Sequence, residues 1–281
     1  MTLPAYLSRQ EIEQQVTLAL AEDIGQGDLT AALIPDNETS SATILCRDDA
    51  VICGINWVNE VFHQLDSTIA IDWQVNDGDR VYANTVLANI SGNSRQLLTG
   101  ERTALNFLQT LSGVATQTAS YVKAVERTGV KLLDTRKTLP GLRKALKYAV
   151  LCGGGHNHRV GLYDAILIKE NHIMAAGSIT SAVKQAQALN SNVMIEVETE
   201  NLDEVREALN VGANRIMLDN MDNATMREAV SIVNGGAELE ASGGVGKDAL
   251  RAIAETGVDY ISIGSLTKHV RAIDLSMRFQ H

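Results

Sequence analysis

From residue 131 onward, short apolar runs alternate with stretches of helical periodicity, and this alternation constrains the fold most. The apolar runs include KLLDTRK, AILIKEN, VMIEVE, RIMLDN, AELEAS and YISIGS. The stretches between them include LRKALKYAVL, NLDEVREALNVG and GKDALRAIAETG. Strands that alternate with helices in this way form parallel sheets, and continuous apolar runs are typical of strands buried on both faces. The pattern predicts a parallel α/β domain over this part of the chain.

Polar residues recur where each apolar run ends. They are Arg136 and Lys137, then Lys169, Glu198, Asp219, Ser242 and Gly264. In a (β/α) barrel the carboxyl ends of the strands form the active-site face, so these residues should converge there. An open doubly wound sheet would gather them at the same edge. Six clear strands rather than eight favour an incomplete or decorated barrel over an open sheet.

The part of the chain before residue 131 has a different texture. Residues 9–22 follow a helical period, short β-like runs with turn signals occupy residues 41–90, and a helical period returns over residues 102–125. We therefore expect a separate N-terminal arrangement of helices and strands.

Net charge limits the partners of the chain. With a charge of −10 at pH 7, general binding to nucleic acid or to an anionic membrane is not expected. No apolar run is long enough to span a bilayer, and the N-terminus lacks the features of a signal peptide. Cys46, Cys53 and Cys152 are too widely spaced for a zinc site and odd in number for a disulfide framework. Reduced thiols and a cytoplasmic location are the expectation.

Against this acidic background, residues 134–159 form a concentrated basic segment, DTRKTLPGLRKALKYAVLCGGGHNHR. Its three consecutive glycines allow a ligand to approach main-chain N–H groups, and His158 and Arg159 follow at once. Neither a Walker loop nor a dinucleotide fingerprint is present. The segment predicts a local anion site. Arg143, Lys144 and Lys147 either shape the field of that site or face solvent.

Lys169 ends a fully apolar run, where an unpaired ammonium group would be costly. It should meet an anionic ligand, form a salt bridge with Glu198 or Asp219, or act as a Schiff-base lysine. The two carboxylates could bind a metal ion, accept hydrogen bonds from sugar hydroxyls or stabilise a developing cation. Period-two geometry puts Glu196 on the same side as Glu198, and the pattern alone does not decide between them.

Small residues end the last two apolar runs, in SGGV and GSLTKH. Turns of small residues that lead into a helix at the final strands of a barrel are the usual site of a phosphate group. Lys268 and His269 could complete the positive charge there.

Together these motifs resemble those of quinolinate phosphoribosyltransferase, also called nicotinate-nucleotide pyrophosphorylase (carboxylating). The chain carries, in order, EDIGQGDLT, GERTALNFLQTLSGVAT, DTRKTLPGLR, CGGGHNHR, DAILIKENH, EVE, MLDN, SGG and GSLTKH. The order and spacing of the motifs carry the resemblance, rather than any single one.

The resemblance implies a glycosyltransferase of the pentosyltransferase class. Its reaction joins quinolinate to the phosphoribosyl group of phosphoribosyl pyrophosphate, giving nicotinate mononucleotide, pyrophosphate and CO2 in de novo NAD biosynthesis. The substrates carry several anionic groups, which agrees with the basic segment. Mg2+ would arrive with phosphoribosyl pyrophosphate, with Glu198 and Asp219 as candidate contacts, and neither a tightly bound metal nor an organic cofactor is expected.

By motif, the resemblance implies catalytic roles for Lys137, Lys169, Glu198 and Asp219. The implied substrate-binding residues are Arg102, Arg136, Lys137, His158, Arg159, Lys169, Glu198, Asp219, Ser242, Gly243, Gly244, Gly264, Ser265, Leu266 and Lys268. His156 stands at a variable position of its motif and ranks below His158.

The implied fold is an N-terminal α/β sandwich over residues 1–112 and an open (β/α) TIM-like barrel of six to seven strands over residues 113–281. A C-terminal helix could pack back on the N-terminal domain. The implied assembly is a homodimer in which Arg102 is donated across the interface. Two other hypotheses stay open at this point: a barrel aldolase that uses Lys169 or Lys137 as a Schiff base, and a phosphate-binding barrel without catalysis.

Overall fold

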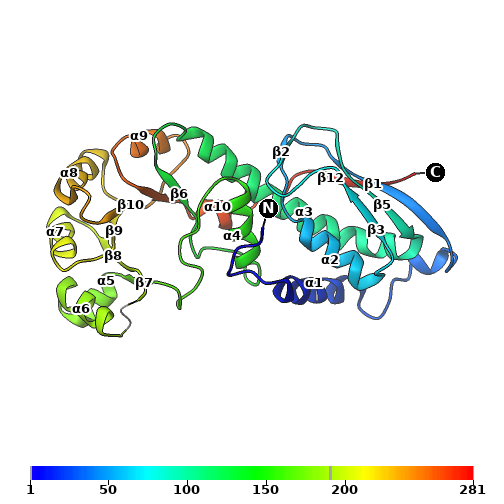
Figure 1. The fold of residues 1–281 in the computed structure, drawn as a ribbon, viewed down its shortest axis with the longest axis horizontal. Helices are drawn as coiled ribbons and strands as arrows, with labels where there is room; N and C mark the ends of the chain where they lie inside the picture. The colour runs from blue at the N-terminus through cyan, green and yellow to red at the C-terminus, as the bar shows by residue number, and fades with distance from the viewer. Residues whose placement is uncertain (1, 190–191, 281) are drawn as a thin grey trace. The chain divides into compact units, whose positions relative to one another are not determined.

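The structure, a computed structural model, describes residues 2–189 and 192–280, which divide into two compact units (Figure 1). The first unit takes in the chain up to Ala119, the segment Thr138–Gly154 and the chain from Leu266 onward. The second unit comprises Ser120–Lys137 and Gly155–Ser265. The boundary expected after residue 112 falls inside a long helix, α3 (Ser94–Ala124).

The first unit is built on an antiparallel sheet with the strand order β12-β1-β5-β3. The strands are β1 (Thr39–Cys46), β3 (Ala70–Trp73), β5 (Thr85–Asn93) and β12 (Leu275–Gln280). Two short strands, β2 (Ala50–Val51) and β4 (Arg80–Val81), pair separately. The β-like runs predicted between residues 41 and 90 are thus largely confirmed. The expected C-terminal helix is wrong, because the C-terminal segment is the strand β12, which pairs with β1 from Ser41↔Gln280 to Cys46↔Leu275.

The first unit also contains helices. They are α1 (Arg9–Ile24), the short 3-10 helix η1 (Ala31–Leu33), α2 (Ile55–Leu65), the greater part of α3, and α4 (Arg143–Cys152). The helix predicted over residues 9–22 is confirmed as α1, which Ser8 and Glu11 start with a reciprocal capping box. At the start of α2 a buried carboxylate replaces a side-chain cap, since Asp77 Oδ1 accepts from the N–H groups of Gly54 and Ile55 at 2.9 and 3.1 Å.

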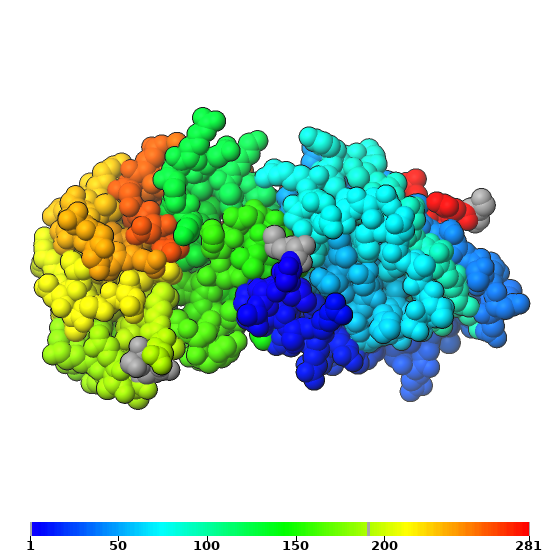
Figure 2. All heavy atoms as spheres, in the orientation of Figure 1, coloured from blue at the N-terminus to red at the C-terminus, as the bar shows by residue number. Residues whose placement is uncertain are grey.

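The second unit contains a parallel sheet with the strand order β6-β11-β10-β9-β8-β7. Its strands are β6 (Lys131–Leu133), β7 (Ile166–Ile168), β8 (Ile195–Thr199), β9 (Arg215–Asp219), β10 (Glu238–Ser242) and β11 (Tyr260–Ser262). The helices are α5 (Glu170–Ala176), α6 (Ile179–Leu189), α7 (Leu202–Asn210), α8 (Asn223–Val233), α9 (Leu250–Ala254) and α10 (Ser265–Lys268), which begins at the last residue of the unit. In the space-filling view, residues of α6, α7 and α8 follow one another along one side of this unit (Figure 2). The predicted alternation of strands and helices is confirmed.

This sheet is an open barrel. Within the described residues β6 and β7 are its two edge strands. The edge of β6 is extended by His156, whose N–H donates to Leu132 O at 2.8 Å and whose carbonyl accepts from Asp134 N at 3.1 Å. The glycine-rich segment therefore leads into the place of a seventh strand, as expected for a barrel of six to seven strands. No helix of the described residues is long and apolar enough to cross a membrane.

Candidate active site

The carboxyl ends of the six parallel strands bring the predicted polar residues of the second unit to one edge of the sheet. Ser242 of β10 pairs with Asp219 of β9. Glu198 of β8 lies opposite Met217 of β9. Lys169 follows β7 directly, and parallel strands end at the same edge, so residues far apart in the sequence converge there.

Lys169 and Glu198 form an ion pair between Nζ and Oε2. A carboxylate partner for Lys169 was one of the sequence-based alternatives, and Glu198 provides it. The Lys169 side chain is 46% exposed and that of Glu198 is 19% exposed, so solvent screens the pair and its contribution to stability is small. Its importance is local, because it holds a cation and a carboxylate side by side at the strand ends.

Arg136 and Arg159 bring two positive charges close together. Burial, and after it the charge of Arg136, lowers the pKa of Arg159. The Arg159 guanidinium is held by Nη1, which donates to Ala165 O at 3.2 Å. Half-buried cations that repel one another are relieved when an anion binds between them, so this pair is suited to a carboxylate or phosphate group.

Lys137 lies against the turn that follows β11. A Cβ atom placed on Gly264 would come within 2.9 Å of Lys137 Cδ and 3.8 Å of Lys137 Nζ. The absence of a Cβ at Gly264 leaves room for the lysine side chain to lie across the turn. The structure thus brings a fourth predicted cation, after Lys169, Arg136 and Arg159, to a turn that was predicted to bind phosphate.

Asp134 anchors the turn that carries His158 and Arg159. It is fully buried directly after β6, and its two carboxylate oxygens accept from Asn157 Nδ2 at 2.6 Å and from the His158 N–H at 3.0 Å. Sequence reasoning gave Asp134 no role. These two bonds explain how the glycine-rich segment, which lacks intrinsic rigidity, is fixed along β6.

Below the strand ends, the interior of the barrel holds a buried polar cluster. His158 Nε2 lies 2.7 Å from Glu196 Oε2 and 3.5 Å from Glu240 Oε2. Arg215 Nη1 lies 3.4 Å from Glu240 Oε2, and its Nη2 lies 2.8 Å from Glu238 Oε2. Burial raises the pKa of Glu196, and burial together with the charge of Glu196 raises the pKa of Glu240 to about 7.

Glu196 and Glu198 both face the inside of the barrel, as period two predicts, but at different depths. Glu198 meets Lys169 at the strand end, whereas Glu196 meets His158 deeper in the barrel. Both ring nitrogens of His158 have protein partners, since Nδ1 accepts from the Arg159 N–H at 2.8 Å. Direct contact between His158 and a substrate therefore stays a prediction, while its structural role is visible.

The turn after β10, one of the two predicted phosphate turns, has an unusual backbone. Gly243 and Gly244 have φ values of +104° and +35°. A Cβ on Gly243 would run into the side chain of Asn220, whose Nδ2 donates to Asp219 Oδ2 at 2.8 Å. Glycine is therefore required after β10, where the chain passes close to the end of β9.

Three predicted site residues lie in the first unit. Arg102 on α3 and Lys268 at the end of α10 are exposed, and Leu266 is fully buried. A substrate contact by Leu266 would thus involve its backbone. Their approach to the strand ends of the second unit stays a prediction.

The basic segment is divided between the units, because residues 138–154 belong to the first. Lys144 pairs with Glu11, and Arg143 Nε donates to Thr138 Oγ1 at 3.2 Å. Lys147 is fully buried, so the alternative that it faces solvent is wrong. Among the lysines and arginines of the segment, Arg136, Lys137 and Arg159 lie in the second unit.

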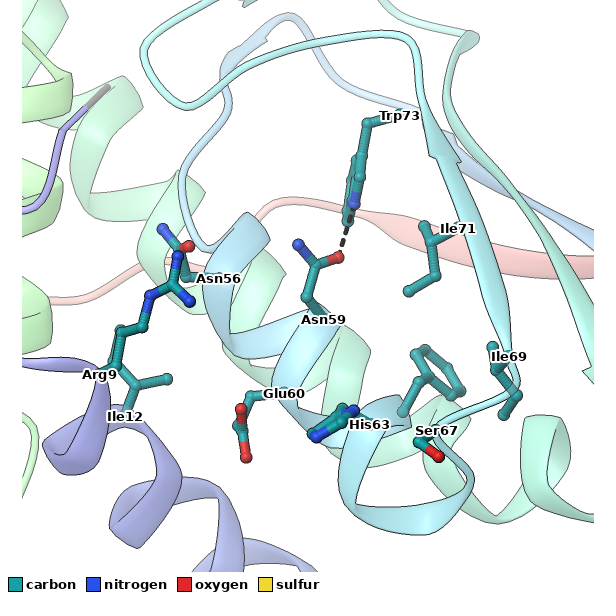
Figure 3. Close-up of a pocket in the computed structure, with 11 residues that line it drawn as sticks. Arg9, Ile12, Asn56, Asn59, Glu60, His63, Ser67, Ile69, Ile71 and Trp73 are labelled. Atoms are coloured by element: carbon teal, nitrogen blue, oxygen red, sulfur yellow. Dashed lines mark hydrogen bonds between the residues drawn. The ribbon is translucent and has the colours of Figure 1, made fainter.

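A pocket of about 520 Å³ in the first unit lies between α1, α2 and β3 (Figure 3). Trp73 Nε1 donates to Asn59 Oδ1 at 2.8 Å across its upper part, and Arg9 and His63 also line it. None of the predicted site residues lines this pocket. With one arginine and no lysine among its lining residues, it lacks the charge that a polyanionic substrate requires.

Known proteins resemble the chain over nearly its whole length. The family model described as quinolinate phosphoribosyl transferase, N-terminal domain, matches residues 28–112, and the C-terminal domain of the same family matches residues 114–278. A probable nicotinate-nucleotide pyrophosphorylase [carboxylating] of Bacillus subtilis is 44% identical over 257 residues, 91% of this chain and 89% of that protein. A mitochondrial quinolinate phosphoribosyltransferase [decarboxylating] of Nicotiana tabacum is 41% identical over 95% of this chain and 82% of that protein.

Among solved structures, the nicotinate-nucleotide pyrophosphorylase of Francisella tularensis superposes with a TM-score of 0.95 and 47% identity, over 100% of both chains. An open barrel with converging cations and carboxylates, together with these matches, defines a phosphoribosyltransferase. The chain belongs to the quinolinate phosphoribosyltransferase family. The aldolase and non-catalytic alternatives for this barrel are thereby set aside.

Proposed function

We propose that the carboxyl edge of the six-stranded sheet is where the chain performs its decarboxylating phosphoribosyl transfer. The ring nitrogen of quinolinate attacks C1 of the ribose, and the bond from C1 to pyrophosphate breaks with its electron pair on the leaving group. The 2-carboxylate then leaves as CO2, a proton takes its place on the ring, and nicotinate mononucleotide results.

The observation that carries this proposal is the concentration of cations at one edge of the sheet. Arg136 and Arg159 lie close enough for one charge to lower the pKa of the other. Lys137 lies against Gly264 at a turn suited to phosphate. Quinolinate carries two carboxylates, and guanidinium groups bind carboxylates in bidentate fashion. Substrates with several negative charges account for this arrangement better than a neutral ligand would.

The carboxylates Glu198 and Asp219 suit the ribose. Departure of pyrophosphate leaves positive charge on the sugar, which fixed carboxylates at the strand ends would stabilise. Their oxygens are also of the type that Mg2+ prefers, so the two residues could contact a Mg2+ ion that enters with phosphoribosyl pyrophosphate. When bound, that ion would neutralise charge on the departing pyrophosphate.

Decarboxylation needs no organic cofactor in this scheme. Loss of CO2 leaves an electron pair on the ring carbon next to the nitrogen. That nitrogen is positively charged once it carries the ribose, and it stabilises the adjacent electron pair. The chain's own residues therefore have to bind and orient the pyridine ring, which is the role of the two arginines.

We also propose a homodimer, in which the exposed Arg102 of one subunit completes the site of the other, and a cytoplasmic location. Cell fractionation would test the location.

The reaction is tested by incubating the protein with quinolinate, phosphoribosyl pyrophosphate and Mg2+ and measuring CO2 and nicotinate mononucleotide. Lys137→Ala and Lys169→Ala should each reduce kcat/KM by about 100-fold or more, because each removes a fixed charge from the site. Lys184→Ala, an exposed position on α6, is the control and should behave as wild type. Wild-type activity in either site variant would overturn the assignment of that lysine.

A further inference from the structure

The ring of His158 is held in one tautomer by its surroundings. Its Nδ1 lies 2.8 Å from the backbone nitrogen of Arg159, which can only donate. Nδ1 must therefore accept, and in the neutral ring the proton is on Nε2. The Nε2–H group donates a hydrogen bond to Glu196 Oε2, and the two heavy atoms lie 2.7 Å apart. His158 is only 8% exposed, so water does not compete for either nitrogen.

Glu196 lies deep in the barrel, next to His158 and Glu240. It is fully buried on β8, and its Oε1 has no hydrogen-bond partner among the described residues. The cations whose charges act on it are Arg215, Arg159 and Lys169. A buried carboxylate costs folding free energy, so its presence here calls for a role.

We propose that Glu196 is a positioning residue for Arg159 and acts through His158. By accepting the hydrogen bond from Nε2–H, Glu196 keeps the Nδ1 lone pair directed at the Arg159 N–H. That bond fixes the backbone from which the Arg159 guanidinium reaches the anion site, and Asp134 fixes the same turn from the other side through the His158 N–H. The arrangement follows the logic by which a carboxylate orients a metal-bound histidine, with a backbone N–H in place of the metal.

A metal ion is the competing interpretation, because one ligand atom from each of His158, Glu196 and Glu240 lies within 4.8 Å of the others. The geometry favours the hydrogen bond. Ligand atoms that each lie about 2.0–2.2 Å from a metal in a tetrahedral site are more than 3 Å apart. The 2.7 Å between Nε2 and Oε2 is hydrogen-bond length, and Arg215 already supplies positive charge to Glu240 at 3.4 Å.

The test compares two substitutions of Glu196 in the full-length protein. Glu196→Gln keeps a carbonyl oxygen that can accept from Nε2, whereas Glu196→Leu removes the acceptor at similar volume. We expect long-range 15N–1H spectra to show the Nε2-protonated tautomer of His158 in wild type and in Glu196→Gln, and its loss in Glu196→Leu. The signal is assigned by its disappearance in His158→Asn. Glu240→Gln is the buried control and should keep the tautomer, because 3.5 Å is too long for a strong bond.

The kinetic effect rests on the proposed function of Arg159. Glu196→Leu should raise KM for quinolinate by about tenfold with a smaller change in kcat. Glu196→Gln should have a KM for quinolinate close to that of wild type. An Nδ1-protonated ring in wild type, or equal quinolinate KM in the two variants, would overturn the inference. So would one equivalent of Zn2+ bound by wild type and lost in Glu196→Leu. If Arg159→Ala leaves quinolinate KM unchanged, the proposed role of Arg159 fails, while the tautomer measurement still tests the link from Glu196 to His158.

Discussion

At the scale of single residues, the proposed anion site should depend on the shape of its cations as well as on their charge. Arg159 is held through Nη1 by Ala165 O and lies close to Arg136. Arg159→Lys keeps the charge but loses the planar fork that binds a carboxylate through two hydrogen bonds. We expect KM for quinolinate to rise by about 10-fold to 100-fold, with a smaller effect on phosphoribosyl pyrophosphate.

Steady-state kinetics with each substrate varied in turn measures this effect. Arg227→Lys, on the exposed side of α8, is the matched control and should leave both KM values unchanged. Equal KM values for quinolinate in Arg159→Lys and wild type would mean that the fork is not used.

The buried carboxylate of Glu240 makes stability depend on pH. Burial and the charge of Glu196 raise its pKa to about 7, against opposing effects of His158 and Arg215. From about pH 4.5 to about 7 the unfolded chain has released a proton that the folded chain keeps, so stability falls as pH rises. The total is on the order of 3 kcal/mol.

Urea unfolding midpoints measured from about pH 5 to about pH 8 test this slope. Glu240→Gln cannot ionise, so we expect its midpoint to lose much of the fall with pH that wild type shows. Glu255→Gln, at the half-exposed end of α9, should follow wild type. The same slope in all three proteins would show that Glu240 of the folded protein is already ionised near the low end of this pH range.

The sequence predicts the residues at the strand ends better than those beneath them. Lys169, Glu198 and Asp219 stand where an apolar run stops, and that position alone brings them to one edge of a parallel sheet. Arg215 begins one of these runs and Glu240 lies within another, and both side chains are buried. A charged residue in such a run indicates a buried ion pair or hydrogen bond. Its partner, however, lies on another strand. Which residues pair depends on the register between the strands, and the sequence of one run does not contain that information.

At the scale of elements, the turn after β10 is constrained by its neighbour β9. Gly243 has a φ of +104°, and a Cβ there would meet the Asn220 side chain. Gly243→Ala should cost about 1–3 kcal/mol of stability and weaken binding of phosphoribosyl pyrophosphate. Gly246→Ala is the matched control, because a Cβ there meets nothing within 4 Å.

Thermal unfolding and substrate titration of the two glycine variants measure these effects. Gly246→Ala is expected to match wild type in both, whereas Gly243→Ala should lose stability and affinity together. Equal behaviour of the two variants would mean that the turn after β10 has room to change its path.

The alternation of strands and helices in the second unit follows from the alternation of apolar runs and helical periods in the sequence. The C-terminal segment is a strand, although a helix was expected there. Leu275 and Met277 are buried and alternate with Ser276 and Arg278, which is the period of a strand. The expectation of a final helix came from the resemblance, whereas this local alternation indicates β12.

At the scale of the whole molecule, the proposed homodimer makes a quantitative prediction about mixed subunits. Arg102 lies in the first unit and Lys169 in the second. In the proposed dimer the two residues of one active site come from different subunits, so each can be substituted in a different chain. Arg102→Ala and Lys169→Ala dimers should each be inactive. In a mixed dimer, the site that keeps Lys169 receives Arg102 from the Lys169→Ala partner and is intact. Random exchange puts about half of the chains in mixed dimers with one intact site of two, so activity should recover to about a quarter of wild type.

The control for this exchange is a pair of variants in the same unit, Lys137→Ala with Lys169→Ala. Every site in their mixed dimers lacks one of the two lysines, so no activity should return however completely the subunits exchange. Mass spectrometry of differently tagged chains measures the fraction of mixed dimers. If mixed dimers of Arg102→Ala and Lys169→Ala form and remain inactive, Arg102 serves its own subunit or no site at all. If activity returns on mixing Arg102→Ala with Lys169→Ala but not on mixing Lys137→Ala with Lys169→Ala, each active site is built from two chains.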